Sequence, residues 1–561
     1  MVKRKPTSSS SDLRTNAVAL SVQRYETLKA QQPWGIRHIQ PFFPPIQKLF
    51  KTEVRDSPQE FGFRLDESVS AIIDSTSIRT SKGHTVPVHR KTTMLLSPFK
   101  WMQGDYGSSL GLPTTEEQSA EIQRKIQDPN NAAYVGAVLS VILAQSGCPH
   151  FPKVYGVFTG VAEKHTIDIS DDYADLSERS WFSSNIGKTF DIRLTEGIHA
   201  SGDFNHTRGA RAGILLGEEI TLENVEELQA PEVLPTEPAE MNQMMRDADD
   251  TDDDESDSSS VSTSYIFGIK SCECESDEED DEEDDDCEPF AWASFTNVPV
   301  QITVMETCTG TFHELCSANP DSNKHLDWLT QVIFALAFAQ RNYGFTHNDL
   351  HSNNVMYVPT EREHMFYSCG GSFFKVPTHG YLIKLIDFER SIGSVRVIGM
   401  KEPKLFMSDH FSVEEEAGGQ YNFEPWYIHK YPEIKPNPSF DLVRLATSMF
   451  WDLFPEGPGH KEYETNKVYI LFMKWLTLDD NQSILFGKKD AQHDRYHGFY
   501  LYKAIARYCK NAVPRTEIMS LKSTYSVNSL PPGEYCCMIE AGDWIKKMAY
   551  PQKCPEHWEF P

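Results

Sequence analysis

The stretch from Leu326 to Gln340 (LDWLTQVIFALAFAQ) is apolar on nearly every side. Other elements have to cover such a helix all round, because a helix at the surface keeps a polar face for water. Residues 439–454 (SFDLVRLATSMFWDLF) repeat this character, and Ser439 is placed to cap the helix at its N-terminus. We therefore expect two core helices in the second half of the chain and predict that this half is mainly helical.

The first half has stronger strand patterns. Residues 86–96 and 298–307 are rich in β-branched side chains, and 149–158 form another strand-like run. The apolar run 132–144 is too short to cross a bilayer and predicts a buried helix. A strand-rich first part and a helical second part predict an α+β arrangement in two lobes, with any active site in the cleft between them.

Acidic residues are concentrated in one segment. The chain has a net charge of −29, and residues 247–288 contribute −20 of it, from 21 carboxylates and one lysine. Like charges at this density repel one another and bury almost no apolar surface, so we expect a disordered insertion that loops out of a domain. The remaining −9 is ordinary for a globular protein, and no basic surface indicates a nucleic-acid partner.

The eleven cysteines indicate a reducing compartment rather than a metal site. They form no CxxC pair and no Cys/His set at zinc spacing. No secretory signal precedes them, so we expect reduced thiols in the cytoplasm or the nucleus, and no membrane partner. The opening MVKRKPTSSSSD fits a disordered tail in which VKRKP is a candidate nuclear signal.

Two short segments carry the polar residues with the most specific spacing. The first, THNDLHSNNV at 346–355, follows the core helix, and the second, Ile386–Glu389, ends a strand 38 residues after Asp349. Phosphoryl transfer needs a carboxylate that accepts a hydroxyl proton and oxygen ligands that hold magnesium against nucleotide phosphates. Asp349, Asn354 and Asp387 supply these groups, so we expect the two segments to meet in one site.

These segments resemble the protein-kinase superfamily, whose catalytic loop has the pattern HxDxxxxN and whose metal-binding motif is DFG. The resemblance implies that His347 supports the loop backbone and that Asp349 is the catalytic base. It also implies that Asn354 and Asp387 bind the metal. The cofactors would be ATP and Mg²⁺, with Mn²⁺ as an alternative metal, and the phosphate acceptor would be a protein.

Other positions follow in the order that the resemblance requires. Lys91, on a predicted strand, fits the VxxK lysine that contacts the α and β phosphates of the nucleotide. Asp441 resembles the aspartate that opens the central helix and fixes the catalytic loop. The end of the strand at 298–307 resembles the segment that joins the lobes and holds the nucleotide, which assigns this task to Met305, Glu306 and Cys308.

The resemblance covers residues 60–515. HNDLHSNNV, PHFPKVYGVFTG and NPSFDLVRLATSMF further resemble serine/threonine kinases encoded by large nucleocytoplasmic DNA viruses, which implies a location in the host cytoplasm, the nucleus or the virion. The expected fold is protein-kinase-like and bilobal, with a β-rich small lobe and a helical large lobe. Its predicted parts are a tail at 1–54, a small lobe at 55–310 with the acidic insertion, a large lobe at 311–520 and an extension at 521–561.

The predicted small lobe departs from the kinase pattern in two places. No GxGxxG lies between Phe61 and Lys91, so the serine-rich residues 66–83 have to cover the phosphates. The helix at 132–144 offers no acidic partner for Lys91, because Gly136 stands where a glutamate is expected. The substitutes within reach in the sequence are Glu116, Glu117 and Glu121.

The motif segments depart as well. Asn348 replaces the arginine that clamps a phosphorylated loop, Glu389 replaces the glycine of DFG, and no clear APE follows. His351 stands where serine/threonine kinases commonly place a lysine, so we expect turnover to depend on pH between about 6 and 8.

Three functions remain open. Intact metal ligands favour a protein kinase, with serine or threonine as the expected acceptor, or a small-molecule phosphotransferase, which shares the DxH pattern. The altered glycine loop and the missing acidic partner favour a pseudokinase or binding scaffold. The sequence leaves the substrate and the oligomeric state undecided.

Overall fold

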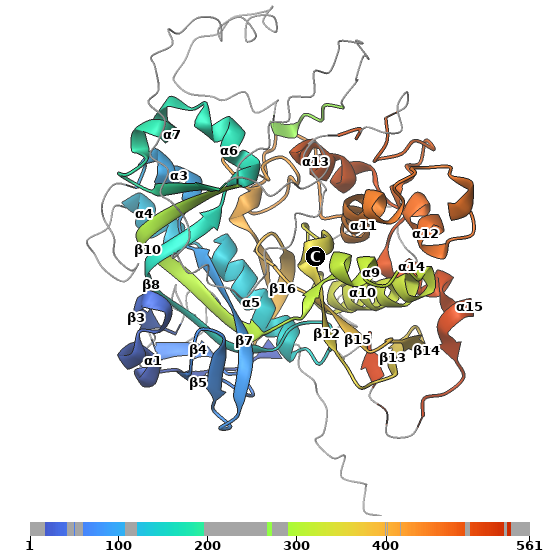
Figure 1. Cartoon of the computed structure of the whole chain (residues 1–561), viewed down its shortest axis with the longest axis horizontal. Coiled ribbons are helices and arrows are strands. Elements are labelled where there is room, and N and C mark those ends of the chain that lie inside the picture. Colours follow the sequence, from blue (N-terminus) through green and yellow to red (C-terminus); the bar gives the residue numbers. More distant parts are fainter. Residues whose placement is uncertain are drawn as a thin grey trace, which may run out of the picture.

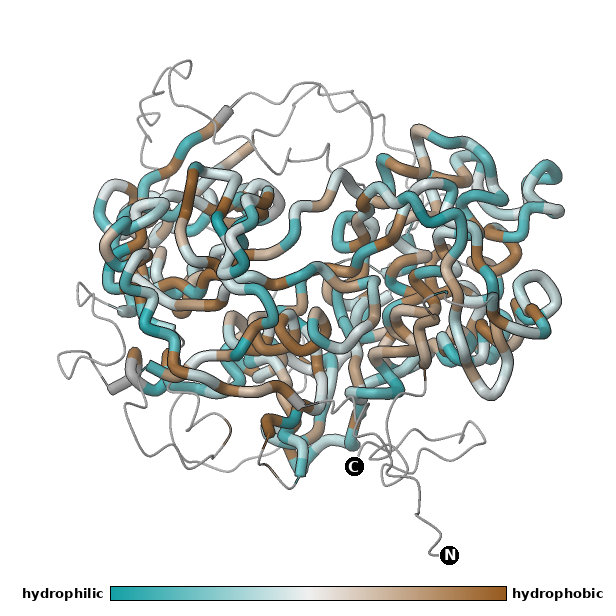
Figure 2. Tube along the Cα trace, turned by 90° about the horizontal axis from the view of Figure 1, so that it is seen from below, coloured by the Kyte–Doolittle hydropathy of each residue, from teal (hydrophilic) through white to brown (hydrophobic). Residues whose placement is uncertain are grey.

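The computed structural model describes residues 17–41, 50, 60–106, 120–195, 266–271, 290–398, 400, 402–415, 417–487, 494–496, 498–531, 534 and 536–539. Within these ranges the chain is a mixture of helices and mostly antiparallel sheets that share one hydrophobic core (Figure 1). Hydrophobic stretches run through the interior, and hydrophilic ones dominate the outer loops (Figure 2). The predicted α+β class is therefore confirmed, whereas the division into lobes stays a prediction.

A seven-stranded antiparallel sheet dominates the first half of the described chain. Its strand order is β3-β8-β10-β7-β6-β5, and β9 also pairs with β10. In this register Lys91 of β7 lies opposite Thr303 of β10. The strands are β3 (Ile36–Gln40), β5 (Val69–Ile72), β6 (Ser77–Thr80), β7 (Thr85–Met94), β8 (Val154–Asp168), β9 (Asp191–Thr195) and β10 (Phe290–Glu306).

Three of these strands match the predicted ones, with different starting points. β8 begins at Val154 rather than at 149, and β10 begins at Phe290 rather than at 298, because FAWASFTN extends the strand by alternation of buried and less buried residues, with Thr296 as its one β-branched residue. The residues that we assigned to an N-terminal tail also contribute, since 36–40 form β3 at the edge of this sheet. The same segment contains β1 (Ala17–Val18), β2 (Leu20–Val22) and α1 (Glu26–Gln31).

Helix α5 (Ala132–Gln145) is the predicted buried helix. The Asn131 side chain caps its start by accepting the N–H of Ala133, and most of its side chains are buried. It packs against β8 and β10 on one side and against β16 on the other. α5 therefore lies between the large sheet and the second half of the chain, as the predicted core position requires.

The two predicted core helices are α10 (Ser322–Tyr343) and α11 (Phe440–Leu453), and both are almost entirely buried. Asp321 caps α10 through the N–H of Asn323, and Gly344 ends it in the left-handed conformation with φ of 57°. Ser439 directly precedes α11 but does not cap it, because its hydroxyl instead accepts the N–H of Ala512. The helix is therefore as predicted, and the predicted cap is wrong.

The second half is less purely helical than we predicted. It contains small sheets in the orders β11-β12-β15, β18-β14-β13-β19 and β1-β16-β17. The strand that ends just before Ile386 is the one that the sequence predicted. The others were not predicted, because they are short and several pair with partners far away in the sequence. The bounds of all these strands are β11 (Gly310–Thr311), β12 (Val355–Pro359), β13 (His364–Cys369), β14 (Ser372–Pro377), β15 (Tyr381–Leu385), β16 (Ile392–Val397), β17 (Lys404–Met407), β18 (Ser526–Val527) and β19 (Cys536–Met538).

The remaining elements complete the two halves. They are β4 (Phe61–Phe63), which pairs with β2, and the helices α3 (Pro98–Gln103), α4 (Ala120–Ile126), α6 (Ser170–Ser177), α7 (Ser180–Asn185), α9 (Phe312–Ser317), α12 (Lys467–Leu476), α13 (Phe499–Tyr508), α14 (Pro514–Ser520) and α15 (Lys522–Tyr525). No helix in the described ranges is long and apolar enough to cross a membrane.

The predicted acidic insertion lies outside the described residues except for 266–271. There the Phe267 ring stacks on Tyr431, with the ring centres 4.4 Å apart. The backbone carbonyl of Phe267 accepts a hydrogen bond from the Arg507 side chain. The described part of the C-terminal extension joins the second half through β18 and β19, and Asn342 of α10 donates to the Ile539 carbonyl.

Candidate functional site

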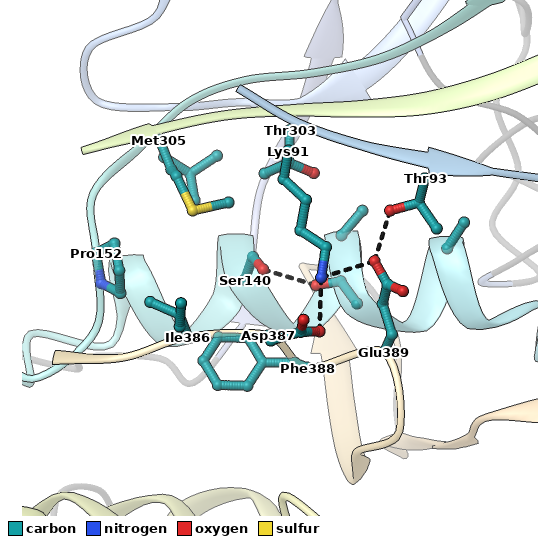
Figure 3. Close-up of a pocket in the computed structure, with 14 residues that line it drawn as sticks. Lys91, Thr93, Ser140, Pro152, Thr303, Met305, Ile386, Asp387, Phe388 and Glu389 are labelled. Atoms are coloured by element: carbon teal, nitrogen blue, oxygen red, sulfur yellow. Dashed lines mark hydrogen bonds and ion pairs between the residues drawn. The ribbon is translucent and has the colours of Figure 1, made fainter. Parts of the chain in front are cut away.

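A pocket with about 420 Å³ of empty space, part of it open to solvent, lies between α5, β7, β10 and the chain that follows β15 (Figure 3). Lys91 and Thr93 of β7, Thr303 and Met305 of β10 and the segment 386–389 face one another across it. The serine-rich residues 66–83 do not line the pocket. They form the β5–β6 hairpin, so the expectation that they cover phosphates gains no support from this geometry.

Lys91 carries the main positive charge in this pocket. Its Nζ lies 2.6 Å from Oδ1 of Asp387 and 2.8 Å from Oε1 of Glu389. Burial alone would lower the pKa of Lys91, but the two carboxylates outweigh burial and raise the pKa above its usual value. The side chain is therefore protonated at neutral pH.

Asp387 lies where the two motif segments meet. Its backbone has φ of 65°, a left-handed conformation that residues other than glycine rarely adopt. The preceding residue fixes it, because the Ile386 N–H donates to the Asn354 carbonyl and the Ile386 carbonyl accepts from Nε2 of His347. Burial raises the pKa of Asp387, but Lys91 outweighs burial and lowers it. The structure thus brings the two segments together as the sequence predicted.

The loop that contains Asp349 is held by a buried carboxylate. Asp441 of α11 accepts the backbone N–H groups of His347 at 3.0 Å and of Asn348 at 2.9 Å. Asn348 has φ of 65°, and its side chain donates to the Arg390 carbonyl and accepts from the Tyr421 hydroxyl. Asn348 therefore fixes the loop through neutral hydrogen bonds at the position where the resemblance led us to expect an arginine.

Asp349 itself has two polar neighbours that the sequence did not suggest. The Tyr502 hydroxyl on α13 donates to Oδ1 at 2.7 Å, and the Arg390 guanidinium lies 3.8 Å from Oδ2. Burial alone would raise the pKa of this carboxyl, but nearby positive charge, above all that of Arg390, outweighs burial and holds the pKa below its usual range. Asp349 is therefore ionised at neutral pH and already accepts a hydrogen bond from a hydroxyl group.

Asn354 and His351 contact each other within the same loop. Nδ2 of Asn354 donates to the Asp349 carbonyl at 2.9 Å and lies 3.1 Å from Nε2 of His351. An amide nitrogen can only donate, so Nε2 accepts and the ring is neutral. Burial lowers the pKa of His351 to about 4. The expected titration of this ring between about pH 6 and 8 is therefore wrong.

The three residues predicted to hold the nucleotide have different positions. Met305 lines the pocket, whereas Glu306 and Cys308 do not. The Glu306 carboxylate instead pairs with Lys384 at 3.0 Å. Burial raises the pKa of the Cys308 thiol to about 12. Among the described residues the Cys308 backbone N–H has no hydrogen-bond partner, so this segment can contribute backbone groups rather than side chains.

Asp387 and Asn354 are the residues that would hold magnesium. Both hydrogen bonds of the Asn354 side chain use Nδ2, which leaves its amide oxygen available as a metal ligand, and the Asn354 backbone is joined to the segment of Asp387 through the Ile386 N–H. A pair of oxygen ligands fits Mg²⁺, which completes its shell with phosphates and water, and would not suit a metal that needs a full set of protein ligands. Within the described residues, no group of three or more His, Cys, Asp or Glu side chains is arranged so that it could hold a metal ion.

Tyr502 and Arg390 are the site residues that sequence reasoning missed. Tyr502 lies 153 residues after Asp349, within a helix whose pattern is otherwise that of a packed surface helix. No spacing rule connects the two positions. Arg390 directly follows Glu389, and only its proximity to the motif could have suggested it.

Comparison with known proteins gives a partial match. No protein-family model matches the chain. Over 99 residues it is 35% identical to the serine/threonine-protein kinase haspin of Mus musculus, and the aligned stretch covers 17% of this chain and 12% of the mouse protein. This similarity supports a relationship to protein kinases over a limited part of the chain. The narrower resemblance to viral kinases stays a prediction.

Proposed function

We propose that this protein is a protein kinase that transfers the γ-phosphoryl group of ATP to hydroxyl groups of proteins, with serine or threonine as the acceptor. The observation that carries the proposal is the contact between the two motif segments, which places Asp387 at 2.6 Å from Lys91 and ties it to Asn354 through Ile386. The partial similarity to a serine/threonine-protein kinase supports this choice of acceptor.

Each residue has a role that follows from its chemistry. Magnesium-bound ATP supplies the phosphoryl group and the charge neutralisation that its transfer requires. Lys91, which stays protonated, binds phosphate oxygens, while Asn354 and Asp387 hold the metal. The backbone beside Met305, including the N–H of Cys308, binds the base.

Asp349 accepts the proton of the acceptor hydroxyl, and its lowered pKa keeps it ionised for this task. The acceptor hydroxyl has to take the place that the Tyr502 hydroxyl has beside Oδ1. His351 is neutral and orients Asn354 instead of balancing charge on the transferred group.

In this proposal the seven-stranded sheet and α5 form the small lobe, and the helices from α10 onward form the large lobe. One observation favours a pseudokinase or binding scaffold instead, because no residue of 66–83 lines the pocket. A small-molecule phosphotransferase has no comparable support beyond the DxH pattern.

The test uses the full chain with γ-labelled ATP, Mg²⁺ and a mixture of proteins, next to the Asp349→Asn variant. We expect label in protein with the wild type and none with the variant. Binding of ATP in calorimetry without any transfer would establish the pseudokinase. Transfer to small hydroxyl compounds but not to protein would establish the small-molecule enzyme.

A further inference from the structure

The helix α5 has no acidic side chain to offer Lys91 in the pocket. The α5 residue that lies against Glu389 is Gly136, which has no side chain. The protonated Lys91 nevertheless has a second carboxylate beside Asp387, because Glu389 reaches it at 2.8 Å. The carboxylate thus comes from the segment of Asp387 and not from the helix.

Gly136 and Glu389 fit each other closely. A Cβ atom at position 136 would lie 2.8 Å from Cγ of Glu389 and 3.4 Å from its Cα and N atoms. The first distance is shorter than real carbon contacts allow, whereas the other two are ordinary contacts. The glutamate side chain can therefore take its path over α5 only because residue 136 is glycine.

A third residue orients the Glu389 carboxylate. The Thr93 hydroxyl donates to Oε1, the same oxygen that contacts Lys91, at 2.5 Å (Figure 3). Thr93 and Lys91 are two residues apart on β7 and so project from the same face of the strand. One oxygen of Glu389 is thus held by two groups of one rigid strand.

We propose that Glu389 is the positioning residue for Lys91, in place of a carboxylate on α5. This inference rests on the proposed function, in which Lys91 binds nucleotide phosphates. Glu389 holds Nζ in place in the pocket through a contact that does not depend on Asp387. In protein kinases generally, the position of the helix that carries the acidic partner controls activity. Here β7 is tied directly to the segment of Asp387, so a movement of α5 does not release Lys91.

The first experiment needs no nucleotide. The full chain and its Glu389→Gln variant are treated with acetic anhydride at fixed pH, and acetylation of Lys91 is followed by mass spectrometry. The variant loses the ion pair that holds Nζ on the side of Glu389, so Nζ is freer to react and acetylation should become about tenfold faster. Glu415→Gln is the matched control, because Glu415 pairs with Lys125 at 3.0 Å outside the pocket and should not change the Lys91 rate.

The second experiment moves the carboxylate to the helix. Glu389→Gln and Gly136→Glu should each weaken ATP binding about tenfold in calorimetry, the first by losing the ion pair and the second by the clash with Glu389. The double variant Gly136→Glu, Glu389→Gly removes the clash and supplies the carboxylate from α5, and should regain affinity to within about threefold of the wild type. Melting temperatures show that each variant is folded.

Two results would overturn the inference. One is an unchanged acetylation rate of Lys91 in Glu389→Gln, which decides the question even if the double variant does not fold. The other is a folded double variant that binds ATP no better than the single ones. If the wild type itself binds no ATP, the proposed function fails, and the acetylation rates still show whether Glu389 controls Lys91.

Discussion

The two sides of the candidate site are built in different ways. The loop around Asp349 has its support where the motif predicts it, from Asp441 and from the bond between His347 and Ile386. On the other side, Lys91 lies at the expected place on β7, but its second carboxylate comes from Glu389 rather than from α5. A motif that is contiguous in sequence thus predicts the chemistry of a site, whereas packing decides which elements supply its ion pairs.

Asp387→Asn should have the largest effect on phosphoryl transfer, because Asp387 contacts Lys91 on one side of the site and follows Ile386, which is bonded to the loop of Asp349, on the other. The change removes the proposed metal ligand and one of two carboxylates at Lys91, with almost no change in volume. We expect phosphoryl transfer at saturating magnesium-ATP to fall by about a thousandfold or more, with the fold intact by circular dichroism. Asp452→Asn, which affects an ion pair with His313 outside the pocket, is the control. Unchanged turnover would remove Asp387 from the site.

Asp441→Ala tests the loop side alone. Two buried backbone N–H groups would lose their acceptor, so the free energy of unfolding should fall by about 3 kcal/mol in urea titrations, and transfer should fall with it. Asp441→Asn keeps an acceptor oxygen for the loop and removes the buried charge. Because burial raises the pKa of the Asp441 carboxyl, the charged form is already disfavoured, so this variant should lose much less free energy of unfolding than Asp441→Ala. Equal stability of the Ala and Asn variants would show that the carboxylate does not hold this loop.

His351→Gln tests the loop side through the pH dependence of stability and of the transfer rate. The ordinary pKa of a histidine is 6.5, and burial in the folded protein lowers that of His351 to about 4. As pH falls from 6.5 to 4, the unfolded chain takes up a proton that the folded ring does not, so stability is lost in this window.

The glutamine variant should lack this component, and its stability should fall less steeply with acid than that of the wild type. Between about pH 6 and 8 the rate profiles of the two proteins should run parallel, because His351 is neutral throughout. A rate profile that flattens in this range only in the variant would restore the charged role for His351.

Tyr502→Phe should have the smallest effect. Without the hydroxyl, Asp349 loses a hydrogen-bond donor, so its pKa should rise and the acid limb of the rate profile should move to higher pH. The acceptor protein no longer competes with Tyr502, and its Michaelis constant should fall about threefold. Tyr508→Phe, an exposed tyrosine on the same helix, should change neither quantity. A raised Michaelis constant would mean that Tyr502 helps the acceptor to bind.

The sequence predicted those parts of the molecule whose pattern is local. Apolar runs revealed α5, α10 and α11, and β-branched runs revealed β7 and part of β10. Apart from β15, the strands of the small sheets escaped prediction, because they are short and some of them, such as β13 and β19, pair across long stretches of chain.

The same distinction applies to the candidate site. The sequence marked Gly136 and Glu389 as separate departures from a pattern, but their contact is a fact of three-dimensional packing. Glu116 and Glu117, which we considered as partners for Lys91, lie outside the described residues, and Glu389 has the position that we sought for them.

The close fit between Gly136 and Glu389 also has an evolutionary consequence. A chain with side chains at both positions would place a Cβ atom 2.8 Å from Cγ of Glu389, so an ancestor with an acidic helix residue could not gain Glu389 in one step. On such a route the helix position becomes glycine before Glu389 arises, and Lys91 has one partner fewer in between. Related chains should therefore carry either glycine at 136 with glutamate at 389 or an acidic residue at 136 with glycine at 389. The two positions should change together across the lineage.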